Sequence, residues 1–290
     1  MTLRHLKIFV SVCEHGSTTK ASKALYIVQP TISHSISELE EYYNVKLFDR
    51  INQRLVLTDI GKDLLVKAKE ILSGFEDFES LATFHEQTSI VKIGASLTLG
   101  QTLIPNYLQL VESHNLKIQP QVVIRSSTAI ETELEQGNLD FAVIGGDVLS
   151  PYLNALPLST DRFVAVAHVD YDIPSSLTFE ELIKYPLLLR ERGSSSRDFI
   201  EKIAISKSLQ VHTKIDSSNN QALIASVYSS LGVSFLPESY AGGHIERGKF
   251  KEIKIKDISS TRTNHLVIHK NKKLNPLQQQ AYDLIKSLGD

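Results

Sequence analysis

Residues 16–43 read GSTTKASKALYIVQPTISHSISELEEYY, and this stretch decides how the N-terminal part of the chain folds. Gly16 suits the left-handed turn that ends a helix, and Ser17 is suited to capping the next helix. Pro30 stands near the start of a further apolar stripe, where a missing backbone N–H costs nothing. Asn44 follows that stripe and tolerates the left-handed conformation that stops a helix. The stretch therefore predicts two consecutive helices joined by a short turn.

The flanking segments complete a winged helix-turn-helix. Upstream, apolar residues recur at three- and four-residue steps from Leu3 to Cys13, which predicts one more helix. Downstream, β-prone pieces at 46–48 and 55–57 enclose Arg50-Ile51-Asn52-Gln53-Arg54, which is typical of a hairpin. Three helices and a hairpin in residues 1–58 indicate a DNA-binding domain of the winged type.

A long helix is expected over 59–88, with Thr58 as its N-cap. Its apolar residues fall on one side and have no evident partner within the chain. We therefore expect this stripe to pair with a second copy of the chain. The seam is expected to include Leu64, Ala68, Leu72 and Phe75.

Residues 89–290 alternate between strand and helix patterns, which places the chain in the α/β class. Apolar strand candidates include Ile90–Gly94 and Leu187–Arg190, each followed by a helix pattern, and Phe141–Ile144, which ends at Gly145-Gly146. Alternation of this kind favours parallel sheets with helices on both faces.

Bulk properties exclude several classes. The net charge of −2 gives no global basic footprint, so a nucleic-acid site must be local. A single cysteine, Cys13, excludes an internal disulfide and a multi-thiolate metal site. Arg4, His5 and Lys7 interrupt the apolar N-terminus, and no run reaches the ~20 apolar residues of a membrane span. We expect a soluble cytoplasmic protein that has no membrane contact.

An ordered, ungapped series of residues runs through 3–61. Its members are Leu3-Arg4-His5-Leu6-Lys7-Ile8-Phe9, Gly16-Ser17, Ala21, Leu25, Gln29-Pro30-Thr31-Ile32-Ser33, Leu39-Glu40, Leu47-Phe48-Asp49-Arg50, Leu57-Thr58 and Gly61. This series resembles the LysR-type transcriptional regulators. Looser similarities to that family's effector domain are Ile104-Pro105, Leu134 with Gly137-Asn138-Leu139-Asp140, Gly193-Ser194 with Arg197, and Gly232-Val233 with Leu236-Pro237.

The resemblance implies an architecture and a mode of action. It implies a DNA-binding domain at 1–58, a linker and dimerisation helix at 59–88, and a two-lobed effector-binding domain at 89–290, similar to periplasmic solute-binding proteins. The first lobe is expected at about 89–161 and 267–290, and the second at about 162–266. The implied partners are double-stranded promoter DNA, a small-molecule effector between the lobes, and further copies in a homodimer or tetramer.

Three positions depart from the family pattern. Val28 stands where a capping Ser is usual, which forfeits a helix cap worth ~1 kcal/mol. His34 replaces a common Arg, so one DNA contact changes. Asn44 replaces a Gly and is physically compatible with it.

The expected DNA contacts lie at the start of the third helix and on the wing. Gln is suited to bidentate contact with adenine, and Thr can meet the thymine methyl. Basic residues on the wing can hold phosphate or enter the minor groove. The candidates are Gln29, Pro30, Thr31, Ser33, His34, Arg50 and Arg54.

The expected effector contacts are hydroxyl and amide side chains at the carboxyl ends of strands. Helix N-termini there offer free N–H groups, which suit a polar or anionic metabolite. The candidates are Ser96, Thr98, Ser127, Ser195, Ser196 and Asn219. Ordinary N-capping explains such residues equally well. Arg190, Arg192 and Arg197 are suited to an anionic ligand, although Glu191 and Asp198 are placed to neutralise them.

No catalytic set, metal site or cofactor motif emerges from the residues. Two other classes stay open: a small-molecule binding protein without regulatory action, and an enzyme of the α/β class. Residues 1–58 argue against the first, and missing catalytic motifs argue against the second. A gel-shift experiment with promoter fragments separates both from a regulator. The effector, the operator and the choice between activation and repression are not encoded in any motif.

Overall fold

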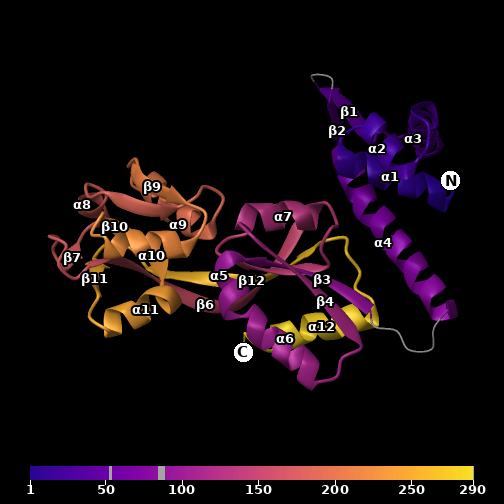
Figure 1. The fold of residues 1–290 in the computed structure, drawn as a ribbon. Helices are drawn as coiled ribbons and strands as arrows, with labels where there is room; N and C mark the ends of the chain where they lie inside the picture. Colours follow the sequence, from indigo (N-terminus) through magenta and orange to yellow (C-terminus); the bar gives the residue numbers. More distant parts are fainter. Residues whose placement is uncertain (52–53, 84–88, 290) are drawn as a thin grey trace.

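A computed structural model describes residues 1–51, 54–83 and 89–289 and shows a small helical domain, a long helix and a two-lobed α/β region (Figure 1). The helical domain contains α1 (Leu3–His15), α2 (Thr18–Leu25), α3 (Gln29–Tyr43) and a hairpin of β1 (Phe48–Ile51) and β2 (Arg54–Leu57). The long helix is α4 (Asp59–Thr83). The expected winged helix-turn-helix is confirmed.

Local signals set the ends of these helices. Gly16 and Asn44 adopt left-handed conformations with φ of 59° and 51°. Ser17 accepts a hydrogen bond from the N–H of Lys20, and the Thr58 hydroxyl accepts one from Gly61. Val28 makes no side-chain cap, so the expected loss of a cap at α3 is confirmed.

The apolar stripe of α4 has a partner within the chain, which corrects the expectation that it has none. Leu65 and Ala68 are each 2% exposed and join the core of the helical domain, with Leu64 and Leu72 packed against it. This happens because α1 lies alongside the first half of α4. Among the α4 residues whose side chains the structure describes, the large apolar ones that are exposed are Ile60, Ile71 and Phe78.

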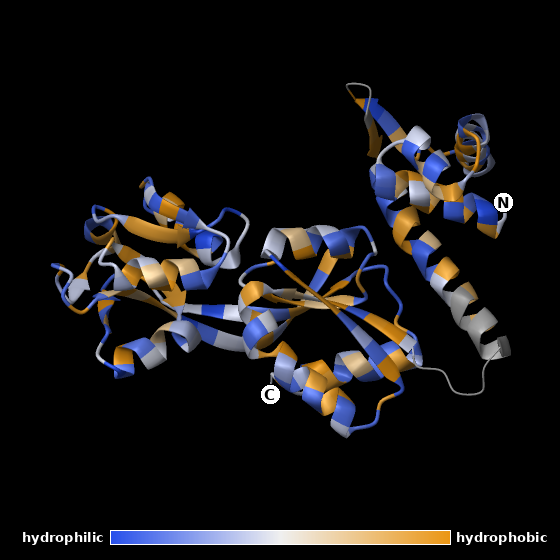
Figure 2. Ribbon diagram, in the orientation of Figure 1, coloured by the Kyte–Doolittle hydropathy of each residue, from blue (hydrophilic) through white to orange (hydrophobic). Residues whose placement is uncertain are grey.

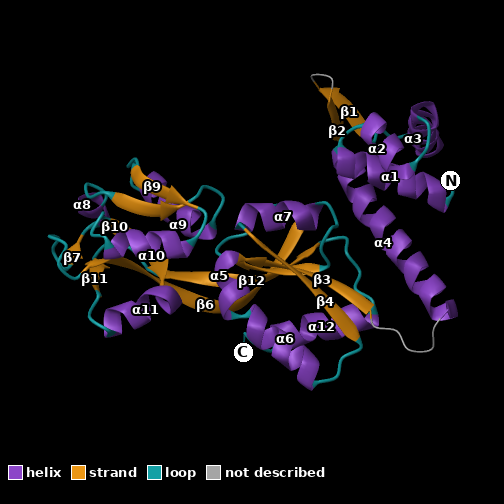
Figure 3. Cartoon of the chain, viewed as in Figure 1, coloured by secondary structure: helices purple, strands orange, loops and turns teal. Residues whose placement is uncertain are grey.

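The α/β region consists of two lobes joined by two long strands, as Figure 3 shows. The first lobe contains β3 (Ser89–Ser96), α5 (Leu97–Thr102), α6 (Ile104–Ser113), β4 (Ile118–Arg125), α7 (Ser127–Glu135), β5 (Phe141–Gly145) and the returning α12 (Pro276–Lys286). The second contains β7 (Ser176–Leu177), α8 (Phe179–Leu182), β8 (Leu187–Arg190), α9 (Ser195–Ser206), β9 (Thr213–Ser217), α10 (Asn220–Tyr228), β10 (Val233–Pro237), α11 (Glu238–Glu246) and β11 (Phe250–Ile255). The joining strands are β6 (Leu153–His168) and β12 (Thr261–His269).

The sheet is mixed, whereas the alternating pattern predicted parallel sheets. The strands β4, β3 and β5 are parallel, as are β10, β8 and β9, but β6, β11 and β12 form antiparallel pairs. The difference arises because β6 and β12 cross between lobes side by side in opposite directions. Residues 264–267 already pair with β5, so β12 joins the first lobe a few residues before the expected boundary at 267.

Apolar residues fill the centre of each lobe, where the strands are coloured hydrophobic in Figure 2. The strand β5 is buried along its whole length between helices on both faces. None of the helices in the described part of the chain has the length and apolar character that a bilayer crossing requires.

The helix α4 also contacts the first lobe, through polar side chains. The Asn271 amide donates to Asp63 at 3.1 Å, and the Lys273 N–H donates to Glu70 at 3.0 Å. Both contacts come from the turn that follows β12. The first lobe follows α4 in the chain, and these hydrogen bonds also hold it against α4.

Candidate functional site

The recognition helix α3 turns its polar residues away from the core. Ile32, Ile36 and Leu39 are buried in the helical domain. Gln29, Pro30 and His34 are exposed, and Thr31 and Ser33 are half-buried beside them. The expected contact residues thus share one accessible surface at the start of α3.

Neighbouring side chains hold Gln29 in place. Its Nε2 donates to the hydroxyl of Thr18, at 3.2 Å, and to that of Ser33, at 2.8 Å. An amide nitrogen carries two hydrogens, so Oε1 is the atom left for a base. This arrangement favours acceptance from the adenine or cytosine amine over the bidentate adenine contact that the residue type suggested.

His34 and the wing complete this surface. The imidazole of His34 is 73% exposed and lies 3.5 Å from Glu38, which also accepts from His5. The hydrogen bond from His5 lowers the pKa of Glu38. The Glu38 carboxylate therefore keeps its negative charge on α3. Arg50 is exposed on β1, whereas the side chain of Arg54 lies outside the described residues.

The six expected effector residues lie in the two lobes but have different surroundings. Ser96 is buried at the end of β3 and accepts from the Gly145 N–H at 3.2 Å. Ser195 accepts from Arg262 Nη1 at 2.7 Å. Asn219 accepts from the Ala222 N–H at 2.8 Å, which is the capping role that was left open.

Of the remaining three, Thr98 alone lines the cavity described below. Thr98 is nearly buried in the first turn of α5. Ser127 and Ser196 are buried at the starts of α7 and α9, and the Ser127 hydroxyl has no hydrogen-bond partner within the described chain.

The lobes touch each other between α7 and α9. The N–H and hydroxyl of Thr128 both donate to the Gly193 carbonyl, at 3.1 and 3.2 Å. Lys202 pairs with Asp147 at 2.5 Å across the same gap. These contacts hold the start of α7 against α9 and the loop before it.

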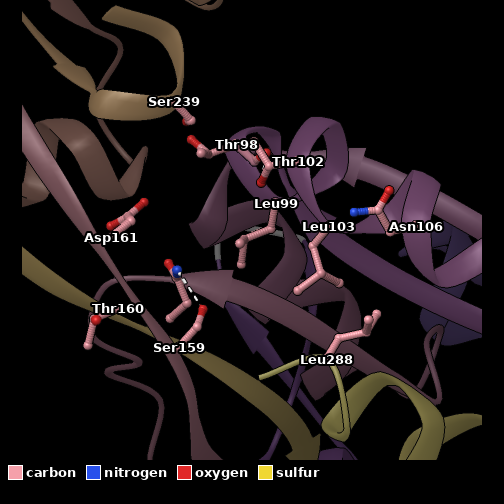
Figure 4. A pocket seen from close by; sticks show the side chains of 11 residues that line it. Thr98, Leu99, Thr102, Leu103, Asn106, Ser159, Thr160, Asp161, Ser239 and Leu288 are labelled. Carbon is pink, nitrogen blue, oxygen red and sulfur yellow. Dashed lines mark hydrogen bonds between the residues drawn. The ribbon is translucent and has the colours of Figure 1, made fainter. Parts of the chain in front are cut away.

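A cavity of about 260 Å³ lies between the lobes, on the joining strands (Figure 4). The helices α5 and α6 form one wall, and Ser239 at the start of α11 faces them from the second lobe. Its lining residues are Thr98, Leu99, Thr102, Leu103, Asn106, Ser159, Thr160, Asp161, Ser239, Asn264 and Leu288.

An ion pair beside this cavity was missed by sequence reasoning. Arg262 on β12 donates from Nε and Nη2 to the two oxygens of Asp161 on β6, at 2.7 and 2.8 Å. Its guanidinium lies 4.3 Å from the Phe163 ring centre. A Cβ on Gly145 would meet the guanidinium at 3.0 Å, so a larger residue there would require the arginine to shift. The sequence signal was polar residues at alternate positions, Arg262 and Asn264, in a β-like run.

The arginines proposed for an anionic ligand are paired within the second lobe. Arg190 donates to Glu191 at 2.8 Å, as the sequence allowed. Arg197 donates to Glu201 at 2.7 Å, which makes Glu201 its partner in place of Asp198. The exposed Arg192 lies 3.6 Å from the same Glu201.

A winged helix-turn-helix, a long helix and a two-lobed domain with an interlobe cavity define a DNA-binding regulator with an effector domain. A model of the bacterial regulatory helix-turn-helix protein, lysR family, matches residues 3–62, and a model of the LysR substrate binding domain matches residues 85–289. The chain belongs to the LysR family of transcriptional regulators.

Individual relatives agree along nearly the whole chain. The HTH-type transcriptional regulator YeiE of Escherichia coli (strain K12) is 29% identical over 288 residues, covering 98% of this chain and 96% of the relative. A full-length OxyR variant from Pseudomonas aeruginosa shares the fold with a TM-score of 0.67 and 22% identity, covering 99% and 94%. The effector binding domain of QuiR in complex with shikimate covers 70% of this chain and 98% of its own, with a TM-score of 0.61 and 19% identity.

Proposed function

We propose that the chain binds promoter DNA through α3 and the β1–β2 wing, and that a small polar metabolite in the interlobe cavity changes this binding. It acts as a homodimer or tetramer in the cytoplasm and carries out no catalysis. The observation that carries the proposal is the cavity itself, because its walls come from both lobes and its floor from the strands that join them.

The position of the cavity allows ligand binding to change the arrangement of the two lobes. A ligand that contacts α5 and α11 together stabilises one arrangement of the lobes over others, and the difference in affinity sets how far the population moves. The structure of the QuiR effector domain with shikimate supports a small ligand for a domain of this fold.

The test is a promoter-binding titration with fractionated metabolite pools. Thr98→Val keeps the shape of this cavity residue and removes its hydroxyl. We expect a metabolite fraction to change the promoter affinity of the wild type, and Thr98→Val to weaken that response while apo affinity stays nearly intact. No response to any fraction in the wild type would reject the sensing role.

Self-association is tested separately. Because Leu65 and Ala68 are already buried within the chain, we place the seam on the remaining apolar side of α4, including Ile71, Phe75 and Phe78. Phe75→Asp would bury an unpaired charge in the seam and is expected to give monomers in sedimentation. A wild type that sediments as a monomer at micromolar concentration would reject the homodimer.

A further inference from the structure

The charge of the cavity restricts what it can hold. Asp161 is the one ionisable side chain among the described residues that line it. No Lys, Arg or His of the described chain reaches its surface. The charged group closest to an anion in this cavity would therefore be the Asp161 carboxylate, which repels the anion.

The nearest cation is already engaged. The Arg262 side chain is 3% exposed, and three of its five N–H groups are used, two by Asp161 and one by Ser195. An entering carboxylate or phosphate would have to displace Asp161 from Arg262 or lie beside the Asp161 carboxylate without a cation. Both outcomes are unfavourable, because the first breaks the ion pair of a buried arginine and the second brings like charges together.

One residue of the cavity wall has a buried polar atom that lacks a hydrogen bond. Asn264 is 3% exposed, and its Nδ2 donates to the Ser159 hydroxyl at 3.1 Å. Its Oδ1 is buried and has no partner in the described part of the chain. A buried acceptor without a donor is costly, so a ligand that supplies an N–H or O–H gains affinity when the Asn264 amide turns toward the cavity to meet it.

Hydroxyl groups dominate the rest of the polar lining. They belong to Thr98, Thr102, Ser159, Thr160 and Ser239. The Thr102 hydroxyl already donates to the Thr98 carbonyl at 3.0 Å and can still accept, whereas the others can donate or accept, so the wall can satisfy ligand hydroxyls in either sense. The volume of about 260 Å³ lies just below the ~300–1,000 Å³ of most ligand pockets, so a small ligand is expected.

We propose that the effector is a small uncharged hydroxylated molecule, of the polyol or monosaccharide class, and that one of its hydroxyls donates to Asn264 Oδ1. This rests on the proposed function, because it names the chemical class for the same cavity. The ligand bridges Thr98 and Thr102 of the first lobe to Ser239 of the second, and the Arg262–Asp161 pair excludes simple anions.

The test compares two classes of probe on the full-length protein by calorimetry. myo-Inositol and D-ribose represent hydroxylated ligands, and sulfate and succinate represent anions. At least one hydroxylated probe is expected to bind the wild type, and Asn264→Leu is expected to weaken that binding at least tenfold. Asn154→Leu makes the same change at an exposed position of β6 outside the cavity and should leave affinity within twofold.

A second variant keeps the proposal testable if Asn264→Leu folds poorly. Asp161→Asn removes the charge that occupies Arg262, so sulfate is expected to raise the melting temperature of this variant but not of the wild type. Tighter binding of sulfate or succinate than of both hydroxylated probes by the wild type would overturn the proposal, as would no binding by either hydroxylated probe. If metabolite fractions still altered promoter binding in that case, the class would be wrong and the proposed function would stand.

Discussion

The DNA-binding end and the sensing end of this chain are built in opposite ways. At the first, the candidate contacts Gln29 to His34 lie within six consecutive residues and remain exposed or half-buried on one helix. At the second, Asp161 and Arg262 lie 101 residues apart and meet with the arginine almost wholly buried. Substitutions at the sensing end should therefore reduce stability, whereas those at the DNA-binding end should reduce affinity and leave stability intact.

The largest effect is expected for Arg262→Ala. Removing one partner of a buried ion pair costs about 3–5 kcal/mol, because the other charge is left uncompensated. The free energy of unfolding, measured with urea, should fall by that order, and hydrogen exchange should increase in β6 and β12. Arg192→Ala removes an arginine side chain that is 82% exposed and should change neither measurement. If Arg262→Ala lowered DNA affinity without lowering the free energy of unfolding, the proposed difference between the two ends would be wrong.

Gln29→Ala should act on recognition alone. Loss of the contact through Oε1 relaxes discrimination at one base pair, where a mismatch typically costs about 1–3 kcal/mol. Because Gln29 is exposed, the melting temperature should stay the same. Binding to an operator and its single-base variants, measured beside random DNA, checks this. Equal losses on operator and random DNA would mean that Gln29 contacts phosphate.

Val28→Ser is expected to stabilise the DNA-binding end. Val28 is 70% exposed and makes no cap, so serine loses little packing and gains a hydrogen bond to the first turn of α3. The free energy of unfolding of the helical domain should rise by about 1 kcal/mol. The matched control is Ser17→Ala, which removes the cap present on α2 and should lower it by a similar amount. A destabilised Val28→Ser variant would show that the valine packs in the assembled protein.

Arg50→Ala should give the smallest effect. It removes one exposed charge from the wing, so the slope of log affinity against log salt should flatten by about one counterion, equally on all sequences. Arg192→Ala, on the second lobe, is the control for a general change in net charge. A slope that matches the wild type would remove Arg50 from the interface.

The same contrast explains what the sequence could predict. Helix ends at Gly16, Ser17 and Asn44 depend on neighbours in the chain, so local patterns identified them. The pairing of β12 with β6 and the Arg262–Asp161 contact depend on segments far apart, which no periodicity records. The α4 stripe was assigned to a partner chain because its apolar period does not say which neighbour covers it.

One strand ties the two ends together. Within β12, Asn264 lines the cavity and Arg262 pairs with the cavity residue Asp161, and the turn after β12 holds α4 through Asn271 and Lys273. Side chains on a strand alternate between faces, so a single inserted residue in β12 would turn every later side chain to the opposite face. The one irregularity in this pairing, between Asn264 and His265, lies on the partner strand, where Leu158 of β6 is the extra residue. The number of residues in β12 is therefore as strictly constrained as their identity. A deletion in this strand should uncouple effector sensing from DNA binding even if both sites kept all their residues.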